Sequence, residues 1–96
     1  MAKMPDARTD EELLHAIAQQ DLPALAELYR RYAGRSLALA HRYDLPDPLQ
    51  AVVDGFLKIF HGADGFARSS LPASTWTIGM MQWHYGSLQT SAAHDR

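Results

Sequence analysis

Residues 47–88 read DPLQAVVDGFLKIFHGADGFARSSLPASTWTIGMMQWHYGSL, and this stretch decides the fold. Its first part has apolar side chains three or four residues apart, the spacing of one helix face: Leu49, Val52, Val53, Phe56, Ile59 and Phe60. Asp47-Pro48 is a helix cap followed by a first-turn proline, and Gly62 is a suitable helix end. The sequence therefore predicts a helix from Pro48 to about Gly62.

The rest of the stretch predicts a loop and a last helix. Residues 62–70 contain turn-forming residues throughout and predict a loop. With Ser70 as its cap, the last helix is expected to begin near Leu71-Pro72 and to run to about Gln89. Residues 71–93 contain no Asp, Glu, Lys or Arg, yet are too rich in Ser, Thr, Gln and Gly for a membrane span. We therefore expect this helix to be buried against another chain, and a homo-oligomer through residues 71–93 is one such arrangement.

The first half of the chain predicts two more helices. Thr9 and Glu12 form a capping box at the start of the first, which is expected to end near Gln20. Asp21 caps the second, which is expected to stop before Pro46 because a residue that precedes proline avoids the helical conformation.

No alternating strand pattern and no internal repeat occur, so the sequence predicts an all-α protein, a compact bundle of about four helices. The expected organisation is a flexible lead at residues 1–8, one helical domain at residues 9–89 and a flexible tail at residues 90–96.

Composition bounds the class of protein. The chain has 96 residues, no cysteine and a net charge of −2 at pH 7. The lack of cysteine excludes disulfides and thiolate metal sites, and fits a reducing cytoplasm. The charge gives no strong attraction to DNA phosphates. No apolar segment reaches the roughly 18 residues of a membrane span, so no membrane association is expected.

No arrangement of residues predicts catalysis or a cofactor. The histidines lack the spacing of metal ligands on one helix face, and each is expected at the surface or its boundary: His15, His41, His61, His84 and His94. Aromatic residues are more informative, because they crowd the second half. We expect Phe56, Phe60 and Trp76 in the core and Phe66 in the loop. Aromatic side chains left exposed would either stack on unpaired bases or form an apolar patch for a protein partner.

The order of these pieces resembles region 2 of the extracytoplasmic-function (ECF) sigma factors of the sigma-70 family. The segments that carry the resemblance are DEELL, LYRRY, VVDGFLKIF and TWTIG, and it extends over about residues 9–89. It implies a divergent sigma-70 region 2-like fold and a role in transcription initiation in the cytoplasm. The partners that it implies are core RNA polymerase and the −10 element of promoter DNA.

The resemblance also implies roles for individual residues. The third helix would bind the clamp helices of core RNA polymerase through Asp47, Gln50, Asp54 and Lys58. The loop and the last helix would hold the −10 single strand, with a flipped base in a pocket at the loop. The DNA-binding residues implied in this way are Phe66, Arg68, Ser69, Ser70, Thr75, Trp76, Gln82, Trp83 and His84.

The chain departs from the family pattern in its charges. Leu49 and Gln50 stand where an acidic pair is usual, and residues 82–84 lack the usual Arg or Lys. These differences favour a second hypothesis: a sigma-like protein-interaction module that binds a regulator, such as an anti-sigma factor, or self-associates without reading DNA. A fragment of a longer sigma factor, a stand-alone domain and a degenerate copy all stay open.

Overall fold

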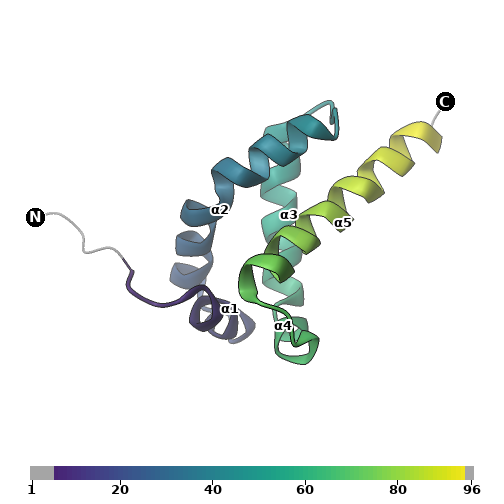
Figure 1. The fold of residues 1–96 in the computed structure, drawn as a ribbon. Coiled ribbons are helices and arrows are strands. Elements are labelled where there is room, and N and C mark those ends of the chain that lie inside the picture. Colours follow the sequence, from purple (N-terminus) through teal and green to yellow (C-terminus); the bar gives the residue numbers. More distant parts are fainter. Residues whose placement is uncertain (1–5, 95–96) are drawn as a thin grey trace, which may run out of the picture.

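The computed structural model describes residues 6–94, with side chains to residue 90, and this part of the chain is all-α with no strand. Its five helices are α1 (Asp10–Ala18), α2 (Leu22–Arg42), α3 (Pro48–Gly62), α4 (Asp64–Ser69) and α5 (Ala73–His94). The expected all-α bundle is confirmed, with one more helix than predicted (Figure 1).

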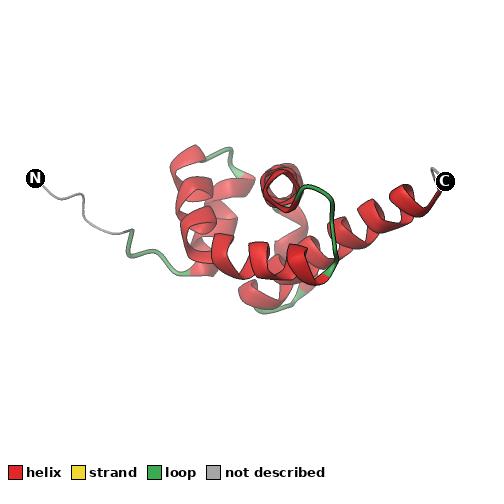
Figure 2. Ribbon diagram, turned by 90° about the horizontal axis from the view of Figure 1, so that it is seen from above, coloured by secondary structure: helices red, strands yellow, loops and turns green. Residues whose placement is uncertain are grey.

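Three long helices build the bundle. The chain ascends along α2, returns along α3 and ascends again along α5, while α1 and α4 lie together at the lower end of Figure 1. The largest side chains with almost no solvent exposure come from all three long helices and from α1: Leu13, Leu14, Ile17, Leu28, Tyr32, Ile59, Met81 and Tyr85. The C-terminal end of α5 extends beyond the other helices in both views (Figures 1 and 2).

The helix starts follow the predicted caps. Thr9 and Glu12 form the capping box of α1, with Glu12 N donating to Thr9 Oγ1 at 3.1 Å and Thr9 N donating to Glu12 Oε1 at 2.8 Å. Asp21 Oδ1 accepts from the first turn of α2, and Asp47 Oδ1 accepts from Gln50 N at 3.2 Å. Helix α1 ends at Ala18 rather than near Gln20, because Gln20 has a left-handed φ of 68°.

The predicted loop at residues 62–70 is wrong, since most of it forms α4. No side chain caps this six-residue helix, and packing stabilises it instead. The Phe66 ring is buried against the rings of His15 and Trp76, with centroids 5.5 and 5.8 Å away. Ser70 does not cap the last helix; its left-handed φ of 59° ends α4, and α5 begins at Ala73.

Helix α5 is longer than predicted and finds its burial within the bundle. It continues past Gln89 to His94, so residues 90–94 of the expected flexible tail are helical, and residues 95–96 lie outside the described residues. One face, including Met81 and Tyr85, packs into the core. A Cβ atom on Gly55 of α3 would lie 2.3 Å from Met81 Sδ, so α3 and α5 approach closely there. The lack of charge on this face therefore requires no second chain.

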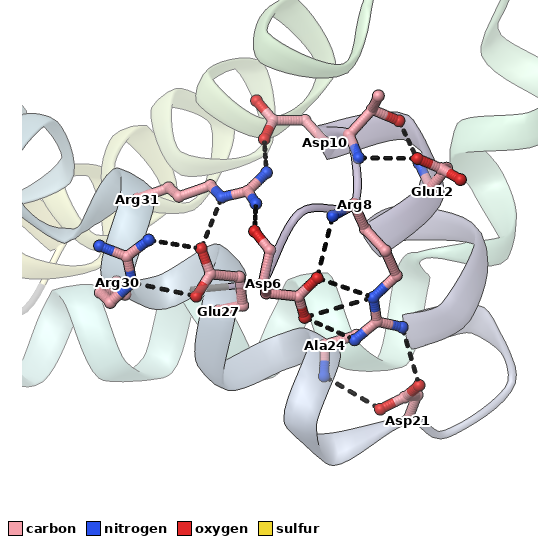
Figure 3. A network of polar contacts seen from close by, with 10 residues as sticks. Asp6, Arg8, Asp10, Glu12, Asp21, Ala24, Glu27, Arg30 and Arg31 are labelled. Carbon is pink, nitrogen blue, oxygen red and sulfur yellow. Dashed lines mark hydrogen bonds and ion pairs between the residues drawn. The ribbon is translucent and has the colours of Figure 1, made fainter. Parts of the chain in front are cut away.

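Part of the expected flexible lead is held by ion pairs (Figure 3). Arg8 bonds the Asp6 carboxylate and reaches Asp21 Oδ2 at 3.1 Å, while Arg31 Nη2 donates to the Asp6 carbonyl oxygen at 2.7 Å. Hydrogen bonds from Arg8 lower the pKa of Asp6 to about 2. The lead therefore contacts α2 from residue 6 onwards, whereas residues 1–5 lie outside the described part of the chain.

Helices α1 and α2 are joined by the same network. Arg31 donates to Asp10 Oδ1 at 2.8 Å and to Glu27 Oε2 at 2.7 Å, and Tyr32 donates to the second oxygen of Asp10. Hydrogen bonds from Arg30 and Arg31 lower the pKa of Glu27 to about 2. The cations of this region are thus neutralised by carboxylates of the same chain.

Candidate functional site

The residues implied for polymerase binding form one polar stripe on α3. This α3 polar stripe consists of Asp47, Gln50, Asp54 and Lys58, spaced three or four residues apart on successive turns. Asp54 is partly buried and the other three are exposed. Gln50 Nε2 donates to Asp54 Oδ1 at 2.9 Å, which fixes both side chains on the surface. The stripe has the mixed polar character that a charged partner helix could contact.

Three residues implied for DNA binding are buried, which corrects their expected role. Phe66 is 7%, Trp76 8% and His84 6% exposed, so none presents a free ring face to solvent. Phe66 and Trp76 lie edge to face in the contact between α4 and α5. A base cannot stack on a ring whose faces already pack against other side chains, so these three residues are structural.

His84 was expected at the surface or its boundary, but it is buried. Its Nε2 has no hydrogen-bond partner among the described residues, and burial lowers the pKa of the imidazole. The Asp54 charge opposes this shift and the Lys58 charge adds to it. His84 packs beside Gly55, where a Cβ would lie at an ordinary contact distance of 3.5 Å from His84 Cδ2 but only 2.3 Å from Met81 Sδ. The neutral imidazole therefore belongs to the contact between α3 and α5, beneath the α3 polar stripe.

This histidine predicts an acid-sensitive fold. The pKa of His84 in the folded chain is below its value of about 6.5 in the unfolded chain. At a pH between these two values the unfolded chain binds more protons than the folded chain. The free energy of unfolding therefore declines as the pH falls below about 6.5. The melting temperature of the wild-type protein should fall between about pH 7.5 and about pH 5.5, and we expect His84→Met to make this fall smaller. His41→Gln, on the surface of α2, should show the same fall as the wild-type protein. Circular dichroism melts measure this, and equal pH slopes in both variants would contradict the assignment.

The other implied DNA residues are accessible. Arg68 is exposed with a 3.4 Å ion pair to Asp64, and Ser70 and Thr75 are exposed. Ser69 is tied more firmly, since its Oγ donates to Phe66 O at 2.7 Å and accepts from Leu71 N at 3.2 Å. These residues lie at the junction of α4 and α5, where they could contact a strand that reaches this end of α5.

Gln82 and Trp83 form a second accessible surface. Trp83 is 63% exposed and, with Gln82, Gly86, Ser87 and Thr90, lines a shallow depression of about 530 Å³. We call these five residues the α5 outer face. It offers one large aromatic side chain among small polar neighbours, an arrangement that suits an unpaired base because every base has a π-face.

An apolar groove between α2 and α3 was missed by sequence reasoning. It has a volume of about 270 Å³ and is lined by Leu22, Leu25, Ala26, Tyr29, Val53, Phe56 and Leu57. Leu22, Tyr29, Val53 and Leu57 are large apolar side chains with substantial exposure, and Leu49 extends the set along α3. The signal that could have found it is the 49-53-57 spacing on α3, four residues apart and beside the buried stripe.

Residues 6–90, whose side chains the structure describes, hold no group of three or more His, Cys, Asp or Glu side chains that could bind a metal ion. Among the described helices, none combines the length and the apolar character that crossing a membrane requires.

The protein is thus an all-α bundle whose polar, apolar and aromatic surfaces lie on its three long helices, α2, α3 and α5. In comparisons with known proteins, no family model, no curated protein and no solved structure matches the chain.

Proposed function

We propose that the chain is a sigma region 2-like domain of a transcription initiation factor, which binds core RNA polymerase and the −10 single strand of a promoter. The observation that carries the proposal is the surface of α3, where the polar stripe and the exposed apolar side chains Leu49, Val53 and Leu57 run along the same helix. A partner helix could bury apolar area against these apolar side chains and pair its charges with the α3 polar stripe. The all-α bundle is the fold class that the proposal requires, and α1, α2 and α3 begin at the caps predicted from the sequence.

The DNA part of the proposal rests on the α5 outer face and on the exposed residues before it. Trp83 supplies a stacking face, Gln82 supplies donors and an acceptor, and Arg68 supplies a cation near the start of α5. Phe66, Trp76 and His84 have no place in this version. The single strand would follow α5 from its first turn towards Trp83.

Polymerase capture tests the proposal. Wild-type protein on beads should retain core RNA polymerase at micromolar concentration in low salt, and Asp54→Lys should weaken retention about tenfold or more, because a reversed charge would face the partner's complementary surface. Asp64→Lys reverses an exposed carboxylate on α4 and serves as the matched control. Failure of the wild-type protein to retain the polymerase would exclude this function.

The apolar groove favours a second candidate, a module that binds a regulator or a second copy of itself without reading DNA. Its lining is apolar and open to solvent, which is typical of surfaces that bind other proteins. Light scattering at several protein concentrations distinguishes the self-associating form. A strict monomer that binds −10 single strands in a salt-sensitive way would rule it out.

A further inference from the structure

The ion pairs of the described residues leave few cations free for a partner. The lysines and arginines paired with carboxylates are Arg8, Arg30, Arg31 and Arg68. Within residues 6–90, Arg35, Arg42 and Lys58 have no ion-pair partner. Two of these three free charges lie on the same helix, α2, and Lys58 belongs to the α3 polar stripe.

Arg35 and Arg42 line one groove. It separates the second half of α2 from α5, has a volume of about 250 Å³, and is lined by Arg35, Ala38, Leu39, Arg42 and Ile78. We call it the arginine groove. The two arginines are seven residues apart on one helix face, about 10.5 Å along the axis at 1.5 Å per residue. Both side chains are exposed.

Arg35 is held in position by the core. Its guanidinium carbon lies 4.3 Å from the centroid of the Tyr32 ring, and the Tyr32 hydroxyl donates to Asp10. Since Tyr32 is buried, the ring is a fixed platform that keeps the cation at the rim of the groove. A charge positioned in advance loses less side-chain entropy when an anion binds.

The arginine groove and the α5 outer face adjoin. Ile78 lines the groove and Gln82 lines the outer face, and the two residues are neighbours one turn apart on α5. C-terminal to this place, α5 is held against α2 by Tyr85 Oη donating to Ser36 O at 3.0 Å and by Gln89 Nε2 donating to Tyr43 O at 2.7 Å. Trp83 lies about 140° around α5 from Ile78, so a ligand that contacts both the arginines of α2 and Trp83 must extend around α5 past Gln82.

We propose that the arginine groove binds the phosphates of a DNA single strand whose bases contact the α5 outer face. This inference rests on the proposed function and deepens it, because it assigns the backbone contacts to α2. Two exposed arginines seven residues apart on one helix face offer two cationic contacts along the groove, which suits a ligand that repeats its anions along a chain. The exposed Trp83 nearby selects for a polyanion that also carries flat aromatic groups.

The proposal also explains how α5 can lack charge of its own. Helix α5 has no Lys or Arg to neutralise a strand laid upon it, and the missing cations come from the neighbouring helix. Stacking and charge neutralisation are thereby divided between two helices that pack against each other.

Salt dependence of single-strand binding tests the inference. The probe is a short, fluorescein-labelled, A/T-rich single-stranded oligodeoxynucleotide, and anisotropy is measured with the full chain over a range of salt concentrations. The double variant Arg35→Gln/Arg42→Gln should reduce the slope of log affinity against log salt by about 1.4, or about 0.7 for each lost phosphate contact. Its affinity in low salt should fall at least about tenfold. Arg35→Lys/Arg42→Lys keeps both charges and should restore the slope.

Arg30→Gln is the matched control, since Arg30 is an exposed arginine of the same helix that pairs with Glu27 outside the groove. Far-UV circular dichroism checks that each variant is folded. An unchanged salt slope in the double Gln variant would overturn the inference. If Trp83→Ala abolished binding in that case, the DNA part of the proposed function would stand without a role for the arginine groove. If the wild-type protein did not bind the oligonucleotide, either alone or with core polymerase, the inference and the DNA part of the proposed function would both be overturned. The polymerase part of the proposed function would still be tested separately by polymerase capture.

Discussion

Replacing Tyr85 by alanine is expected to lower the free energy of unfolding by about 3–5 kcal/mol, the usual loss for a large buried aromatic side chain. Tyr85 is fully buried, its ring lies 5.7 Å from that of Tyr43, and its hydroxyl donates to Ser36 O. It therefore fixes α5 to α2. A loss of this size is a large part of the 5–15 kcal/mol that is typical of natural domains.

Urea denaturation measures this effect. Tyr85→Phe keeps the ring and removes the hydroxyl, and should cost about 1 kcal/mol. Trp83→Ala is the matched control, a large aromatic residue on the same helix that is mostly exposed, and should change the stability by about 0.5 kcal/mol or less. Similar losses in Tyr85→Ala and Trp83→Ala would show that α5 does not pack by the face described.

Phe66→Ala is expected to destabilise the fold by about 3–5 kcal/mol, because Phe66 fills the space between His15 of α1 and Trp76 of α5. The melting temperature should fall by about 4–8 °C for each kcal/mol in a domain of this size. Thermal melts and single-strand binding are to be measured on the same samples.

Phe66→Leu separates the core role from a stacking role. Leucine fills most of the volume but has no aromatic ring, so this variant should cost only about 1–2 kcal/mol and keep its affinity for a single strand. A stable Phe66→Leu variant that lost binding would restore Phe66 to the DNA-contacting residues.

Local sequence predicted α1 to α3 well because caps and apolar stripes agree there. Thr9, Asp21 and Asp47 each accept a backbone hydrogen bond at the predicted helix start. Helix α4 could not be predicted in this way. Its six residues include Gly65 and have no side-chain cap, and the packing of Phe66 against two other helices stabilises it.

The site was predicted less well because burial depends on contacts between distant segments. The charge-free composition of α5 suggested a surface for another chain, but Met81, His84 and Tyr85 are covered by the bundle. The close approach of Gly55 to Met81 comes from α3, and no periodicity within α5 reveals it. Trp83 and Gln82 are exposed, and their contact with a single strand stays a prediction.

The ion-pair network around Arg31 has an electrical consequence for the whole molecule. Asp10 and Glu27 neutralise Arg31 in the half of α2 that lies near α1. The arginines of α2 without an ion pair, Arg35 and Arg42, lie towards its other end. Asp47 and Asp54 carry free negative charge on α3. A net charge of −2 thus conceals an uneven distribution of free charge, and in low salt a polyanion would be attracted to the half of α2 that lies beyond the Arg31 ion pairs.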